Sequence, residues 1–428
     1  MPKGKKKGKY EHRRTELPYS SDEDAGIDMT NDNYSETSGA SDLRSNHDDA
    51  ENDIQEKFEE KVLEIIDALS ARANAARASA LVALRSALQR RYLAHLLSGQ
   101  RATLADHVTR ALRRGRDAER RAAAAVAPLL ALQIGEEGTE EFLAEVRPAL
   151  AAAAVDKSAS LDTRTECCSS LAVLCYLLED DLTEVLEIMR MYETIFSGSY
   201  LKGDGSVKVS GAAVEEGAWH AAALDGWALL LLLAEPPHAR ALLADRAPSF
   251  ARLAELLDAC SLEVRMAAGG ALAVAHERAR GDDDEFEWDD SGVLPRLERL
   301  ARDSHKYRAK RDRKLQRATF RDILKYFEEG VVCGERVRVC GSALELDSWG
   351  ARGAYGALAA ALGAGLAALA PHSEPLRDAL GLAPPASAPP ARGKLNKLQR
   401  HLQNSAACKA RTVARNKSRD KRSAALAL

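Results

Sequence analysis

Cationic side chains at helical spacing are the feature of this sequence best suited to binding another molecule. Between residues 302 and 321 the chain holds nine bases and two acids. Six of these bases recur every three or four residues, namely Arg302, Lys306, Lys310, Lys314, Arg317 and Arg321. On a single helix such residues share one face, so we expect a basic stripe about five turns long. Its self-repulsion would be relieved by a polyanion or an acidic partner.

A second basic segment occupies residues 392–428, which contain eleven bases and one acid. Leu395, Leu398 and Leu402 form a narrow apolar stripe at helical spacing. The cations singled out for binding here are Lys394, Lys397, Arg400, Lys409, Arg411, Arg415, Lys417, Arg419, Lys421 and Arg422. Because aromatic residues are absent, we expect salt-dependent contact with phosphate or RNA backbone rather than base stacking. A nuclear localisation signal or a merely solvated tail is the alternative.

Acidic segments offset these cations, so the net charge of the 428-residue chain is only −3. Residues 16–60 carry 15 acids against two bases, and residues 282–290 carry seven acids and no base. The second segment lacks the Gly and the closing Glu of a calcium-binding loop. It could instead pair with the basic stripe, which is the alternative to an external polyanion. For residues 16–60 we hypothesise that they shield the basic surfaces until displaced.

Patterns that would indicate catalysis or metal binding are missing from the sequence. None of the motifs GxSxG, HExxH or GxxxxGK[ST] occurs, and the ten histidines are scattered. The seven cysteines include no CxxC pair, and Cys168 and Cys175 are spaced as on one helix face. This usage indicates reduced, buried thiols in a cytosolic or nuclear protein. We predict no enzyme, no cofactor and no small-molecule substrate.

Helices must position the cations, because Ala and Leu dominate the sequence and aromatic residues make up only 5%. Apolar residues at helical spacing predict helices over residues 58–69, 81–92, 103–115, 122–134, 139–148 (ended by Pro148), 161–178, 182–196, 212–234, 250–257, 262–280 and 293–300. Helix pairs recur every 35 to 45 residues or so, roughly the period of HEAT and armadillo repeats. We predict an all-α, armadillo/HEAT-like α-solenoid, with a large single-core helical domain as the alternative.

The chain divides into five segments by composition. Residues 1–53 are predicted to be disordered, basic and then acidic, and residues 54–301 form the helical-repeat domain. Residues 302–382 hold the basic helix and a short hairpin of residues 335–339 and 344–347, joined through Gly341-Ser342. A Pro/Ala linker at 383–391 and the basic, helical tail at 392–428 follow. No secretory signal opens the chain, and the apolar stretches 226–234 and 354–370 are predicted to be buried helices rather than membrane spans.

Several of these motifs resemble the interferon-related developmental regulator family. The most specific is the run 303–310 (DSHKYRAK), continued by RKLQR at 313–317 and FRD at 320–322. Further similarity lies at 101–115, at 161–175, in ALDGW at 223–227 and in KLNK at 394–397. The resemblance runs from about residue 54 to 428, and the chain departs from it in its Ala-rich composition and its Pro/Ala linker.

The resemblance implies an armadillo-like helical fold and a regulator of gene expression that acts by binding. One implied role is attachment to ribosomes that silences translation. In that role residues 394–422 would occupy the messenger path and residues 302–321 could face ribosomal RNA. The other is nuclear transcriptional co-regulation, in which the solenoid binds corepressor proteins. We therefore expect ribosomes, ribosomal RNA or corepressors as partners, no membrane, a monomer, and a cytoplasmic and nuclear location.

Overall fold

The computed structural model describes residues 45–134, 136–202, 212–245, 248–283, 286, 292–302 and 310–383. The chain divides into two units, Met1–Gln55 and Glu56–Leu428, and the description below concerns the second. The first helix, α1, covers Ser45–Ala68, so helical structure begins before the predicted start at Ile54. The Pro/Ala linker after Ala383 and the basic tail lie outside the described residues.

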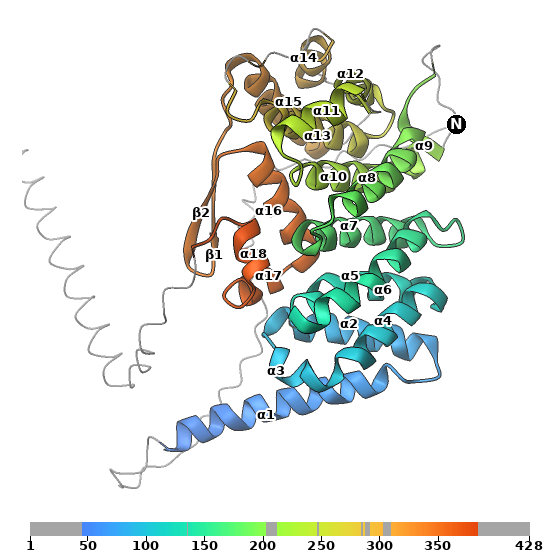
Figure 1. Ribbon diagram of the computed structural model, residues 1–428, viewed down its shortest axis with the longest axis vertical. Helices are drawn as coiled ribbons and strands as arrows, with labels where there is room; N and C mark the ends of the chain where they lie inside the picture. The colour runs from blue at the N-terminus through green and yellow to red at the C-terminus, as the bar shows by residue number, and fades with distance from the viewer. Residues whose placement is uncertain are drawn as a thin grey trace, which may run out of the picture. The chain divides into compact units, whose positions relative to one another are not determined.

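Helices stacked in two rows make up this unit (Figure 1). One row, called the inner row here, contains α2 (Asn74–Arg90), α5 (Asp117–Ala131), α7 (Leu161–Leu178), α10 (Gly217–Leu231) and α13 (Leu262–Arg280). Each inner helix packs on the next one along the row. The outer helices pack against them and are α4 (Arg101–Arg114), α6 (Glu136–Val155), α8 (Leu182–Phe196), α11 (Pro236–Asp245) and α12 (Phe250–Glu255). The protein is thus an all-α helical-repeat solenoid, as predicted.

Short elements connect the two rows. They are α3 (Ala94–Leu97) and α9 (Ala212–Glu215), together with the 3₁₀ helices η1 (Ser98–Gln100), η2 (Ser197–Ser199) and η3 (Leu256–Asp258).

Helix starts in the inner row follow from capping residues. Ser160 accepts a hydrogen bond from the backbone N–H of Thr163 at the start of α7, and Ser261 accepts one from Val264 at the start of α13. A side-chain acceptor at this position satisfies a backbone donor that the helix cannot. The predicted bounds 161–178, 182–196 and 262–280 are all confirmed.

Two helix predictions are wrong. α6 continues through Pro148 to Val155. Pro148 is exposed, so water can satisfy the helical carbonyl that a proline leaves without its donor. The predicted helix 212–234 is divided at Glu216 into α9 and α10, and the prediction missed α11 altogether.

The C-terminal part of the described chain begins with two helices and a hairpin. These are α14 (Leu294–Arg302), α15 (Lys310–Glu329), β1 (Glu335–Val339) and β2 (Ser342–Leu346). The strands are antiparallel, which confirms the predicted hairpin, and Val339 pairs with Ser342. The turn is therefore Cys340-Gly341 rather than Gly341-Ser342, with φ angles of 52° and 83°. Two positive φ angles are typical of a two-residue hairpin turn.

Three helices then return along the inner row, and we call them the C-terminal strip: α16 (Trp349–Leu362), α17 (Gly365–Leu369) and α18 (Glu374–Ala379). α16 contacts α5, α7, α10 and α13, while α17 contacts α2. Glu277 of α13 accepts backbone hydrogen bonds from Trp349 (2.9 Å) and Gly350 (2.7 Å) at the start of α16. One hydrophobic cluster extends from Val62 to Leu380, so the predicted regions 54–301 and 302–382 share a single core.

Cysteine burial agrees with the prediction at some positions only. Cys167, Cys168 and Cys175 are buried in α7, as expected, but Cys260, Cys333 and Cys340 are exposed. The exposed thiols lie in turns or near the hairpin, where helical spacing carries no information. No helix in the described ranges is both long and apolar enough to span a membrane.

Candidate polyanion-binding site

The helix α15 carries cations on one side and an apolar anchor on the other. Phe320, Ile323 and Tyr326 recur every three residues and are all buried. They pack on α13 opposite Gly269, where an added Cβ would lie 2.7 Å from Ile323 Cδ1 and 2.9 Å from Phe320 Cε1. The absence of a side chain at Gly269 therefore allows α15 to approach α13 closely.

An aromatic cluster fixes the C-terminal half of α15. The hydroxyl of Tyr326 lies 3.0 Å from Nδ1 of His276. The ring of Phe327 lies 5.1 Å from that of His276, and Tyr326 also packs edge-on against Trp349. Burial raises the pKa of Tyr326 well above its ordinary value, so its hydroxyl stays protonated. These contacts hold α15 in one orientation, which fixes the direction of its outer face.

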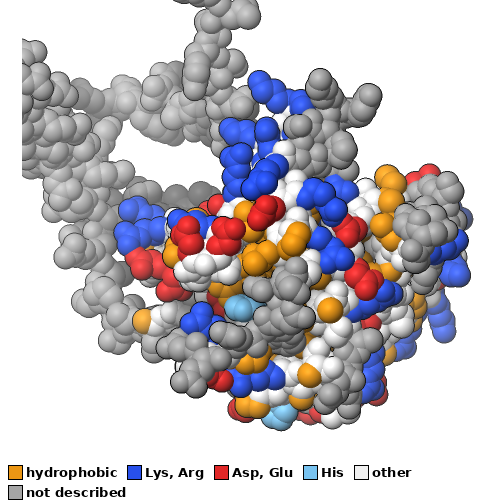
Figure 2. All heavy atoms as spheres, turned by 90° about the horizontal axis from the view of Figure 1, so that it is seen from above, with side chains coloured by type: hydrophobic (Ala, Val, Ile, Leu, Met, Phe, Trp, Pro, Cys, Tyr) orange, Lys and Arg blue, Asp and Glu red, His pale blue; other side chains and the backbone are white. Residues whose placement is uncertain are grey.

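That outer face presents Lys310, Arg311, Lys314 and Arg321, which are all exposed. Within the ranges that the structure describes, none of the four forms an ion pair with a carboxylate, whereas Lys325 lies 3.9 Å from Glu329. We call these four residues the α15 cationic face. Figure 2 looks onto the end of the stack that carries α14 and α15, and Lys and Arg side chains gather there. Arg317 is half-buried and its Nε donates to the carbonyl of Arg313.

The predicted single basic helix from Arg302 to Arg321 is wrong. Arg302 is the last residue of α14, and α14 packs against α15, so the chain turns between them. The turn follows from packing, because Leu297 and Leu300 of α14 are buried. In addition, Gln316 of α15 donates a hydrogen bond to the Leu300 carbonyl at 3.4 Å. Arg302 instead lies 3.2 Å from Glu298. Lys306 and the tail cations Lys394 to Arg422 lie outside the described residues.

The acidic loop was the candidate partner for this basic stripe. Of residues 282–290 the structure describes Asp282, Asp283 and Phe286. Asp283 lies 3.1 Å from Arg240 of α11, whose guanidinium also stacks over the Phe286 ring at 4.4 Å. These contacts direct the described part of the loop toward α11. Pairing of the remaining acids with the basic stripe stays a prediction.

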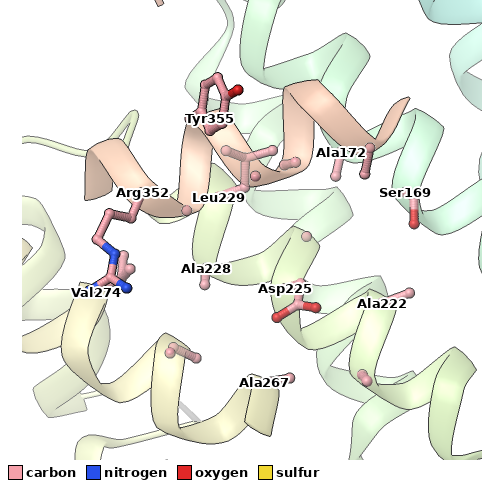
Figure 3. A pocket seen from close by; sticks show the side chains of 18 of the residues that line it. Ser169, Ala172, Ala222, Asp225, Ala228, Leu229, Ala267, Val274, Arg352 and Tyr355 are labelled. Atoms are coloured by element: carbon pink, nitrogen blue, oxygen red, sulfur yellow. The ribbon is translucent and has the colours of Figure 1, made fainter. Parts of the chain in front are cut away.

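A groove with apolar walls lies between α7, α10, α13 and α16 and was not predicted from the sequence (Figure 3). Its volume is about 870 Å³, and Ala and Gly dominate its lining. Asp225 extends from α10 into the space beside α13, and Arg352 reaches from α16 toward Val274. Its only sequence signal was a lone acid within the otherwise uncharged helix 217–231, since the Ala and Gly lining looks like any other core.

The charged groups of this groove differ from those on the α15 cationic face. Asp225 is exposed at its residue surface, yet the protein atoms packed around its carboxylate raise the pKa of that group to about 7. Among the described residues no cation pairs with it. At the other end, Trp349 is only 7% exposed, and the Arg352 guanidinium stacks over its ring at 4.7 Å. Among the described residues, Trp349 Nε1 and Arg352 Nη1 have no hydrogen-bond partner, and both atoms are buried. The polar groups that the groove presents are therefore mainly carboxylates, those of Asp225, Glu263 and Glu335.

Other titratable groups serve packing. Ser199 Oγ lies 2.7 Å from Nδ1 of His220, and burial lowers the pKa of that histidine to about 4. In the part of the chain that the structure describes, no three His, Cys, Asp or Glu side chains are placed to hold a metal ion.

Taken together, the stacked helix pairs, the C-terminal strip and the α15 cationic face define a helical-repeat protein with an exposed cationic surface. Comparison with known families gives the more particular assignment. Residues 33–328 match the interferon-related developmental regulator family and residues 374–423 match the interferon-related protein conserved region. The chain belongs to the interferon-related developmental regulator family, and its role is regulatory.

Named relatives extend over nearly the whole chain. Interferon-related developmental regulator 1 of Mus musculus is 36% identical over 96% of this chain and 91% of its own length. The human protein of the same name is 34% identical over the same shares. Interferon-related developmental regulator 2 of Mus musculus is 36% identical over 86% of this chain and 83% of its own length.

Proposed function

We propose that this protein is a non-enzymatic regulator of gene expression that binds ribosomes through RNA and represses translation. The observation that carries the proposal is the α15 cationic face, whose four side chains are exposed while their helix is anchored on α13. They form no ion pair with any carboxylate in the described part of the chain. Fixed cations at helical spacing suit a phosphate backbone, because each neutralised phosphate releases a counterion. The basic tail supplies further cations at Lys394 to Arg422.

The proposed division of labour has the solenoid positioning two basic elements on one RNA surface. The α15 cationic face is held by its apolar anchor and needs no further ordering to bind. The tail has enough cations to contribute most of the affinity, and in the ribosome-bound state we place it along the messenger path. A repressor of translation would act in the cytoplasm. The same basic tail could also serve as a nuclear import signal.

Co-sedimentation with purified ribosomes at increasing salt tests this function. Neutralising Lys310, Arg311, Lys314 and Arg321 to Gln removes about four phosphate contacts, so the slope of log K against log salt should fall by about 3. Deleting residues 392–428 should abolish co-sedimentation at physiological salt. The matched control is Lys325→Gln on the same helix, because Lys325 pairs with Glu329 and should change little.

Two outcomes would contradict the proposal. Full co-sedimentation after removal of the tail would exclude the tail as the RNA-binding arm. If the variants bind ribosomes normally while the tail deletion only moves the protein out of the nucleus, the second candidate role is favoured. In that role the solenoid would bind corepressor proteins and the tail would serve as an import signal.

A further inference from the structure

The groove between α10, α13 and α16 has the properties of a docking site that needs an occupant. It combines small apolar side chains with the carboxylates of Asp225, Glu263 and Glu335. Gly270 also opens onto the groove, and a Cβ built there meets no atom within 4 Å.

The chemistry of the groove specifies that occupant. Walls of Ala and Gly permit close approach of a helix that carries larger apolar side chains. The carboxylates of Asp225, Glu263 and Glu335 favour an occupant that carries Lys or Arg beside its apolar side chains. A leucine-bearing basic helix meets both requirements.

We infer that residues 394–404 of this chain dock in the groove. The segment has Leu395, Leu398 and Leu402 on one stripe, with Lys394, Lys397 and Arg400 beside it. Its leucines match the apolar walls, and its cations match the three carboxylates. The groove would thus hold the basic tail when no polyanion does.

The connection to the fold is short enough for this contact. Ala379 of α18 lines a neighbouring cavity together with Leu232 and Gly350, and Leu232 also lines the groove. Ten residues lie between Ala383 and Lys394, and extended chain spans about 3.3–3.6 Å per residue. This tether keeps the segment at an effective concentration on the order of millimolar, so weak affinity for the groove suffices.

Hydrogen exchange on the full-length protein, without RNA, tests the inference. Amides of residues 394–404 should exchange at least about tenfold more slowly than unstructured chain. Filling the groove by Gly270→Leu, or placing a charge in the stripe by Leu398→Asp, should return them to the unstructured rate. Leu426→Asp is the control in the same tail and should leave the protection intact.

Three results would overturn the inference. Exchange of 394–404 at the unstructured rate in the wild-type protein would mean that the groove serves another partner. Protection that survives Gly270→Leu would mean that the segment is ordered elsewhere. Protection that grows with protein concentration would mean that a second copy provides the occupant. None of these readouts involves RNA, so they are separate from the test of the proposed function.

Discussion

Two adjacent glycines in α13 provide a matched pair that tests how α15 is held. Gly269 faces α15, and a Cβ there would lie 2.7 Å from Ile323 Cδ1 and 2.9 Å from Phe320 Cε1. Gly270 faces open space, with no atom within 4 Å of its added Cβ. The substitutions Gly269→Ala and Gly270→Ala are chemically identical and one residue apart. Any difference between them therefore reports the contact with α15.

The expected magnitudes follow from helix propensity and packing. Ala is favoured over Gly inside a helix by about 0.8–1 kcal/mol, so Gly270→Ala should raise the free energy of unfolding by up to about 1 kcal/mol. Gly269→Ala receives the same gain but crowds two fully buried side chains, and overpacking costs about 1–3 kcal/mol. The second variant should thus be about 1–3 kcal/mol less stable than the first.

Urea unfolding followed by circular dichroism measures this difference as a shift in midpoint at constant slope. Ribosome co-sedimentation gives a second readout, because displacement of α15 moves its cationic face while Gly270→Ala leaves it in place. Equal stability of the two variants would refute the close packing of α15 on α13. It would also remove the basis for calling this helix a fixed platform.

Three further predictions concern titration and reactivity. Asp225 has a pKa raised to about 7 in the folded protein, so the free energy of unfolding should fall as the pH rises from about 4 to 7. In urea unfolding at a series of pH values, Asp225→Asn should remove this dependence. An unchanged dependence would contradict the raised pKa. His220 has a pKa lowered to about 4, so stability should fall as the pH drops from about 6.5 to 4. His220→Gln should flatten this part of the profile of melting temperature against pH. A steeper decline in the variant than in the wild-type protein would be inconsistent with a buried neutral ring. Iodoacetamide should label Cys260 and Cys333 in the native protein and spare Cys168 and Cys175, because burial raises the pKa of both thiols to about 12. Mass spectrometry identifies the labelled residues. Rapid labelling of Cys168 would show that α7 is not packed as described.

Sequence reasoning predicted the elements whose signals are local. Helical periodicity predicted the bounds of α7 and α13, and the alternating residues of 335–339 predicted β1. The cations at 310, 314, 317 and 321 were placed on one helix correctly. The predicted end of a helix at Pro148 is wrong because a proline ends a helix less often where water can bind the carbonyl that it leaves without a donor. Whether that carbonyl faces solvent depends on the packing.

The remaining features depend on contacts between residues far apart in the chain. The turn between α14 and α15 arises because Leu297 and Leu300 are buried, and charge spacing alone does not report that. The groove arises where Asp225 of α10 and Arg352 of α16 line one cavity. Each looks like an ordinary helix residue in the sequence. Only the return of the C-terminal strip along the inner row brings them together.

That return has a consequence for how the protein is made. In a simple repeat stack each unit contacts only its neighbours, so it can form as the chain emerges. Here Gln89 of α2 donates to the carbonyl of Leu362, 273 residues later, and α16 covers α5, α7, α10 and α13. During synthesis the covered side of the inner row stays bare until the strip has been translated. We therefore expect the nascent protein to expose apolar surface that chaperones can bind, and we expect a premature stop before Trp349 to leave a stack that folds incompletely.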